Sequence, residues 1–130
     1  MGRVLVIDDE AMICGIFEDV LTIDDRFAVG IGSSGNELRA LLAAHDDVVA
    51  IICDQTLCGE TGIAIHATIE SILRERRIAF VLVHGGGPEL GESLPDGYFA
   101  DHRIVEVHKP MPHIMDIVGI VDAEIAKARV

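Results

Sequence analysis

Two hydrophobic patterns alternate along the chain, short unbroken apolar runs and longer stretches with helical spacing. The apolar runs are rich in β-branched residues and predict buried strands at Val4–Ile7, Phe27–Ile31, Val48–Cys53, Ala79–Val83 and Arg103–His108. The other stretches predict helices at Ala11–Ile23, Asn36–Ala44, Ile63–Arg76 and Pro112–Arg129. This alternation is typical of a parallel sheet that is covered by helices on both faces.

The same spacing predicts which helix residues face the core. The first helix is expected to bury Ile13, Ile16, Phe17, Val20 and Leu21. The third is expected to bury Ile65, Ile69, Ile72 and Leu73. Ser34 or Asn36 could cap the second helix. Between His84 and Arg103, glycines and prolines are dense, so we expect a short or irregular fourth helix there.

Length and charge narrow the function classes. A chain of 130 residues is long enough for one core, so we expect a single domain over residues 1–130 with no output domain. The net charge of −12 argues against direct binding to nucleic acid or to anionic lipid, and favours protein partners. The sequence shows neither a membrane-length apolar run nor a signal-peptide pattern, and its three cysteines form an odd set typical of reduced thiols. A cytoplasmic location is therefore expected.

Polar residues with shared chemistry stand where the predicted strands end. Asp8 and Asp9 follow the first strand, Asp54 the third, His84 the fourth, and Lys109 the fifth. The carboxyl ends of parallel strands lie at one edge of a sheet, so these side chains are expected to meet in one crevice. Crowded carboxylates repel one another, and a hard divalent cation relieves that repulsion. The pattern therefore predicts a phosphoryl-transfer site.

The ordered set resembles the receiver domain of two-component response regulators. The likeness rests on the strand and acidic pair ending in Asp8 and Asp9, on Asp54 as the phosphoacceptor, on Gly62 after the phosphoacceptor loop, and on Lys109 followed by proline. It covers essentially the whole chain. The implied fold is a doubly wound, flavodoxin-like α/β sheet of five parallel strands in the order 2-1-3-4-5.

The resemblance also implies roles for these residues. Asp9 and Asp54 would ligate Mg²⁺, Asp8 would do so through water, and the carbonyl of Thr56 would complete the protein ligands. Asp54 would accept a phosphoryl group from phosphohistidine, and Lys109 would balance its charge. The chain would then be a signalling phosphoacceptor rather than an enzyme, catalysing at most its own phosphorylation and dephosphorylation. Its partners would be a histidine kinase or a phosphotransfer protein, and a downstream target protein.

Three residues depart from the family pattern. His84 replaces a Thr or Ser, Glu106 replaces the switch aromatic residue, and Cys58 stands where proline is common. The usual hydroxyl-to-aromatic coupling cannot operate here. Because His84 and Glu106 end neighbouring strands, we hypothesise that they form a charge-assisted pair that replaces that coupling, against the alternative of a solvated histidine and an exposed glutamate.

Other interpretations remain open. A receiver-shaped docking module could bind proteins without phosphorylation, and the strand-end polar residues could serve only as turn and cap groups. Gly30–Gly35 matches a dinucleotide-binding fingerprint, which would make the chain an oxidoreductase fragment. The remaining histidines show no metal-like spacing, so core or surface positions are expected for His45, His66, His102, His108 and His113.

Overall fold

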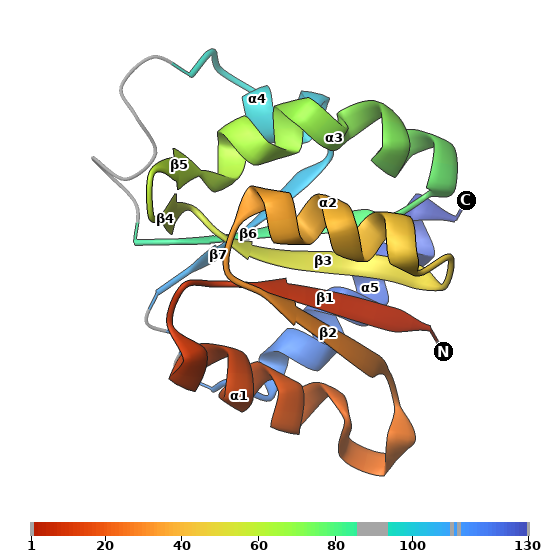
Figure 1. Cartoon of the computed structure of the whole chain (residues 1–130). Coiled ribbons are helices and arrows are strands. Elements are labelled where there is room, and N and C mark those ends of the chain that lie inside the picture. Colours follow the sequence, from red (N-terminus) through yellow and green to blue (C-terminus); the bar gives the residue numbers. More distant parts are fainter. Residues whose placement is uncertain (1, 86–93, 110, 112, 130) are drawn as a thin grey trace.

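A five-stranded parallel sheet organises the chain (Figure 1). The computed structural model describes residues 2–85, 94–109, 111 and 113–129. The sheet is formed by β1 (Arg3–Ile7), β2 (Ala28–Gly32), β3 (Val48–Asp54), β6 (Ala79–His84) and β7 (Ile104–His108). Its spatial order is β2-β1-β3-β6-β7, which is the predicted order 2-1-3-4-5. A separate two-stranded hairpin of β4 (Thr56–Leu57) and β5 (Glu60–Thr61) follows β3.

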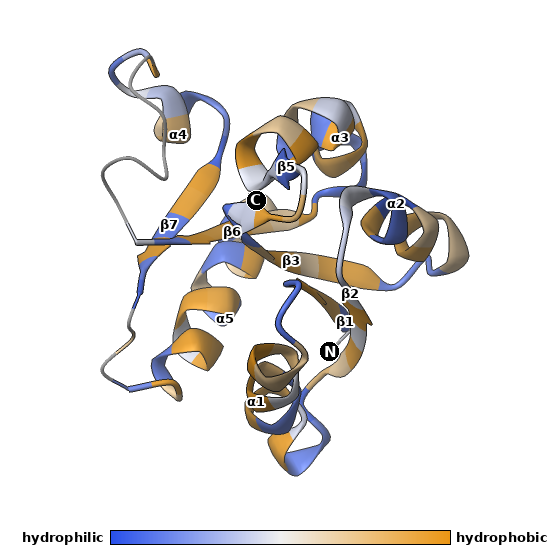
Figure 2. Ribbon diagram, turned by 60° about the vertical axis from the view of Figure 1, so that its left-hand side comes forward, coloured by the Kyte–Doolittle hydropathy of each residue, from blue (hydrophilic) through white to orange (hydrophobic). Residues whose placement is uncertain are grey.

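Helices cover both faces of the sheet. They are α1 (Ala11–Leu21), α2 (Gly35–Ala44), α3 (Gly62–Arg76), α4 (Tyr98–Asp101) and α5 (Asp116–Ala128), with a 3₁₀ turn, η1, at Ile23–Asp25. Helices α1 and α5 lie on one face, and α2 and α3 lie on the other (Figure 2). None of the helices in the described part of the chain has both the length and the apolar composition that a membrane crossing needs.

Each face of the sheet has its own apolar core. Successive strand residues point to opposite faces, so Val4 and Val6 pack with α1 and α5, whereas Leu5 and Ile7 pack with α2 and α3. All of β3 is buried, because it lies at the centre of the sheet with helices above and below. Burying each large side chain of this kind stabilises a fold by about 1.5–3 kcal/mol. The continuous apolar runs of the sequence are therefore a direct consequence of double coverage.

Several predicted boundaries and faces were wrong by small amounts. Helix α1 ends at Leu21 rather than Ile23, because the chain turns there into η1, where Asp24 has a positive φ of 56°. Helix α5 begins at Asp116, and Pro112, where it was expected to begin, is outside the described residues. Ile16 and Ile72 were expected in the core, yet they are 41% and 37% exposed. Both stand at the side of their helix's apolar stripe, where neighbours cover them only in part.

Two further expectations are settled by local geometry. Ser34, not Asn36, caps α2, because its side-chain oxygen accepts a hydrogen bond from the Glu37 N–H at 3.1 Å. The fourth helix is short, as predicted, since α4 spans four residues. Residues 86–93, in the same glycine-rich region, are outside the described part of the chain.

Candidate functional site

The carboxyl edge of the sheet lies on the side of the β4–β5 hairpin (Figure 1), and the predicted acidic residues stand at the strand ends there. Asp8 follows β1 directly, and Asp54 is the last residue of β3. These strands are neighbours, and Ile7 is paired with Cys53. The next residue on each, Asp8 or Asp54, therefore stands at the corresponding position at the strand end. Lys109 follows β7, and its Nζ lies 2.7 Å from Oδ1 of Asp54. The structure therefore brings together an ammonium and a carboxylate that are 55 positions apart in the sequence (109 − 54).

Asp54 is almost enclosed at this edge. Its side chain is 5% exposed, whereas that of Lys109 is 39% exposed, so solvent reaches the pair from the lysine side. Apart from this ion contact, Oδ1 of Asp54 accepts no hydrogen bond of ordinary geometry from the described residues. A buried anionic oxygen of this kind needs a positive partner. Lys109 is one such partner, and the neighbouring carboxylate of Asp8 leaves an excess of negative charge that suits a second cation.

Crowding of negative charge is visible at Asp8. Burial raises the pKa of Asp8 above its ordinary value, and the charge of Asp54 raises it further. A hydrogen bond from the Glu10 N–H to Oδ1 of Asp8, at 2.9 Å, and the charge of Lys109 both act in the opposite direction. A divalent cation at this edge would remove the repulsion and favour the ionised carboxyl.

The donor set fits Mg²⁺. Asp8, Asp9 and Glu10 offer carboxylate oxygens that all lie within 4.8 Å of one another, and the last two are exposed. Hard carboxylate oxygens, open to water on one side, are the ligands that hydrated Mg²⁺ accepts. Glu10 was missed in the sequence because it follows the acidic pair at the start of α1 and looks like an ordinary helix-end residue. Ligation by Asp9, Asp54 and the carbonyl of Thr56 stays a prediction.

The loop after Asp54 is fixed by tight backbone packing. Gln55 donates its N–H to the carbonyl of Val83 at 2.9 Å and accepts the Gly62 N–H on its own carbonyl, also at 2.9 Å. A Cβ at Gly62 would lie 2.6 Å from Cδ1 of Leu82 and 2.7 Å from the carbonyl oxygen of Asp54. Only glycine allows this approach without displacing the chain. The loop is thus held against the end of β3, which keeps Asp54 in position.

His84 and Glu106 form the pair that was hypothesised from the sequence. Nε2 of His84 lies 3.0 Å from Oε1 of Glu106, and their side chains are 0% and 37% exposed. His84 also accepts the Lys109 N–H on its backbone carbonyl at 2.8 Å, so the last residue of β6 helps to position the lysine. The contact is confirmed, whereas a switching role for it stays a prediction.

The glycine motif at residues 30–35 does not favour a dinucleotide. The Gly35 N–H donates to the carboxylate of Glu60, and the Ser33 N–H donates to Oε1 of Glu37 at 3.2 Å. A pyrophosphate would need these N–H groups at the start of α2, and would meet two carboxylates there. The oxidoreductase interpretation therefore loses its physical basis.

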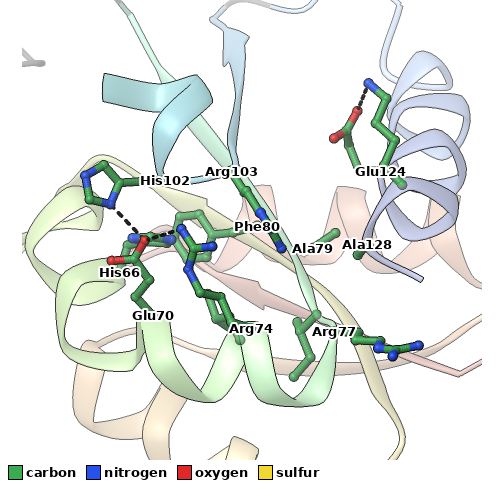
Figure 3. A pocket seen from close by; sticks show the side chains of 13 residues that line it. His66, Glu70, Arg74, Arg77, Ala79, Phe80, His102, Arg103, Glu124 and Ala128 are labelled. Carbon is green, nitrogen blue, oxygen red and sulfur yellow. Dashed lines mark hydrogen bonds and ion pairs between the residues drawn. The ribbon is translucent and has the colours of Figure 1, made fainter. Parts of the chain in front are cut away.

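A different cavity, of about 360 Å³ (Figure 3), lies at the amino ends of β6 and β7, opposite the carboxyl ends that hold the acidic residues. Its walls include Ala79, the first residue of β6, about 17 Å along the strand from His84. Glu70 accepts from Arg74 at 3.2 Å and contacts Nδ1 of His102 at 2.8 Å. Charges inside this cavity therefore already neutralise one another in part, and it shares no residue with the acidic edge.

Comparison with known proteins gives matches among solved structures. No family model matches the sequence, and no curated protein matches it either. A response regulator receiver domain protein from Clostridium thermocellum aligns with a TM-score of 0.79 and 21% identity, over 99% of this chain and 98% of that chain. A sensor protein from Polaromonas sp. JS666 aligns with a TM-score of 0.80 and 16% identity, over 98% of both chains. A response regulator receiver protein from Sinorhizobium medicae WSM419 gives 0.74 and 21%, over 98% and 96%.

These neighbours share nearly their whole length with this chain, at low sequence identity. They show that the chain has the fold of a response regulator receiver domain, as the resemblance implied.

Proposed function

We propose that this chain, which has the receiver-domain fold, is a phosphoacceptor of a two-component phosphorelay, with residues 1–130 acting as one receiver domain. The observation that supports this most is the pairing of Lys109 Nζ with the enclosed Asp54 carboxylate at 2.7 Å, beside Asp8. A carboxylate with an adjacent ammonium and a cation-binding acidic cluster has the parts that phosphoryl transfer requires. In this role the chain is a signalling protein whose only catalysis is on its own acyl phosphate.

The proposed step is a displacement at phosphorus. An oxygen of Asp54 attacks the phosphorus of a phosphohistidine, the P–N bond breaks, and its electron pair returns to the imidazole, which takes up a proton. Lys109 already contacts Asp54, and its Nζ would move to an oxygen of the transferred group as a compact point charge. Water can enter from the exposed lysine side for later hydrolysis.

Asp8, Asp9 and Asp54, with the carbonyl of Thr56, are the groups we assign to Mg²⁺, and Glu10 lies close enough to the acidic pair to support it. The ion, when bound, supplies charge neutralisation on the phosphoryl oxygens. Asp8 prepares the site through its hydrogen bond to the Glu10 N–H, which fixes its carboxylate at the start of α1. Asp9 is exposed and would bind the ion directly, whereas Asp8 would bind it through water, as would the exposed Glu10.

The pair of His84 and Glu106 is the switch that we assign to this chain. His84 is fully enclosed and its ring contacts Glu106 at 3.0 Å, so a phosphoryl group on Asp54 would compete with Glu106 for the imidazole N–H. Loss of this contact would release Glu106, which is partly exposed on the edge strand β7. The surface to which a target protein binds would then change.

A groove of about 470 Å³ beside the acidic edge suits the protein that donates the phosphoryl group. Its polar lining residues are Asp8, Glu10 and Lys109, and its apolar walls are Ile13, Ile16, Phe17, Val83, Met111 and Ile114. Because Asp8 and Lys109 belong both to the groove and to the acidic edge, the groove adjoins the phosphoacceptor site. A helix of a kinase or phosphotransfer protein that presented a phosphohistidine to Asp54 would cover these apolar side chains.

Phosphorylation can be tested directly with acetyl phosphate. We expect intact-protein mass spectrometry to show a gain of one phosphoryl group that requires Mg²⁺ and is lost in Asp54→Asn. Asp46→Asn is the matched control, because Asp46 is an exposed acidic residue on the loop before β3. If the wild-type protein gains no phosphoryl group from acetyl phosphate or from a phosphorylated phosphotransfer protein, the docking-module alternative replaces this proposal.

A further inference from the structure

Three metal-ligating side chains meet on the two strands at the β7 edge of the sheet, outside the acidic cluster. His84 of β6 pairs in register with His108 of β7, and Glu106 precedes His108 by two residues. Paired residues of parallel strands, and residues two apart on one strand, point to the same face of a sheet. All three therefore lie on the face that α2 and α3 cover, the face that also holds Leu82 and Ile104.

From this arrangement we propose that His84, Glu106 and His108 bind a borderline divalent transition metal ion, of which Zn²⁺ is the type. One ligand atom from each residue can be chosen so that all three lie within 4.8 Å of one another. Two ligands about 2.0–2.1 Å from one metal ion are separated by roughly 2.9–3.4 Å, from right-angle to tetrahedral geometry. The 3.0 Å between Nε2 of His84 and Oε1 of Glu106 falls in that range.

The third ligand is close enough to complete the set. The rings of His84 and His108 have centroids 4.5 Å apart with an interplanar angle of 62°, so they meet edge to face rather than stacked. His108 is exposed and can rotate, whereas His84 is held by burial and by the ring of Phe99, which lies parallel to it at 6.4 Å. One buried ligand and two exposed ligands allow an ion to enter from solvent. Water would fill the open fourth position.

Ligand chemistry separates this site from the acidic edge. Two imidazoles and one carboxylate suit Zn²⁺, Ni²⁺ or Cu²⁺, whereas Mg²⁺ prefers oxygen ligands such as those of Asp8 and Asp9. The metal ion takes the place of the hydrogen on Nε2 of His84; a neutral imidazole then carries its proton on Nδ1, and an imidazolium releases one proton to solvent. Metal binding here does not require phosphorylation of Asp54, but the metal ion and a phosphoryl group on Asp54 would compete for the imidazole of His84.

Zn²⁺ binding can be measured by isothermal titration calorimetry in excess Mg²⁺, which occupies the acidic edge. The background variant is Cys58→Ser, because Cys58 is exposed and its thiol could also ligate zinc. We expect one Zn²⁺ per chain in this background and in Asp9→Asn, with affinity reduced at least about tenfold in His108→Gln and in Glu106→Gln. His113→Gln, which removes an exposed histidine elsewhere, should bind as the background does.

Side-chain ¹⁵N spectra locate the ligands without using affinity. We expect Zn²⁺ to shift the imidazole nitrogens of His84 and His108 and to leave those of His45 and His113 in place. The proposal is overturned if no Zn²⁺ binds in excess Mg²⁺, if Asp9→Asn abolishes binding, or if His113→Gln weakens it as much as His108→Gln. Circular dichroism of each variant confirms the fold, and the exposed positions of Glu106 and His108 make loss of folding an unexpected result.

Discussion

Replacing Gly62 with alanine is a direct test of how the phosphoacceptor loop is held. The added Cβ would stand 2.6 Å from Cδ1 of Leu82 and 2.7 Å from the carbonyl oxygen of Asp54, both far inside ordinary contact distance. Leu82 is fully buried and the carbonyl belongs to the backbone, so neither can move without disturbing β3 or β6. Overpacking of this kind costs about 1–3 kcal/mol.

The helix propensity of alanine offsets part of this cost. Alanine exceeds glycine by about 1 kcal/mol inside a helix, and by less at Gly62, the first residue of α3. We therefore expect Gly62→Ala to lower the free energy of unfolding by about 1–2 kcal/mol. Average unfolding entropies for a 130-residue chain convert this to a fall in Tm of roughly 4–7 °C. Urea unfolding and calorimetry measure both quantities.

Gly15→Ala is the matched control, because Gly15 lies inside α1 and a Cβ there would meet nothing within 4 Å. The same chemical change should stabilise the protein there by about 0.5–1 kcal/mol. An unchanged or increased stability of Gly62→Ala would refute the close approach of α3 to Asp54. It would also remove the reason given for the position of the phosphoacceptor.

The other predictions concern the buried histidine and the cysteines. Burial lowers the pKa of His66 below its usual value near 6.5, so the unfolded chain takes up that proton first as pH falls. His66 thus contributes stability that is complete above pH 6.5 and is lost as pH falls below it. In urea unfolding, the free energy of unfolding of His66→Gln should therefore decrease less steeply below pH 6.5 than that of His113→Gln. Equal decreases in the two variants would contradict the assignment. Cys58 is exposed, whereas burial raises the pKa of both Cys14 and Cys53. One thiol per native chain should therefore react rapidly with a disulfide reagent, against three after unfolding, and Cys58→Ser should abolish the rapid phase.

The sheet and its charged edge could be predicted because each depends on a simple pattern. A strand buried on both faces, such as β3, must be apolar throughout, and the residue that follows it falls at the edge where ligands bind. The contact of Asp54 with Lys109 and that of His84 with Glu106 both follow from this rule together with strand order.

What could not be predicted depends on rotation and on tertiary contacts. Ile16 has helical spacing with its neighbours, yet it stands beside the buried stripe and lines a groove instead. His108 shows no metal-like spacing in the sequence because its candidate partner, His84, lies on the adjacent strand, 24 positions earlier (108 − 84). Glu10 likewise could not be recognised as a candidate ligand from the sequence, because its closeness to Asp8 and Asp9 depends on how the chain enters α1.

His84 contacts its surroundings in two independent ways, through its ring to Glu106 and through its carbonyl to the Lys109 N–H. Side-chain exchange at this position removes the first contact and spares the second, since every amino acid supplies the same backbone oxygen. Mutations at codon 84 can therefore separate signal output from phosphoryl chemistry in this protein. They should alter binding of a target protein while the backbone hydrogen bond to Lys109 is kept.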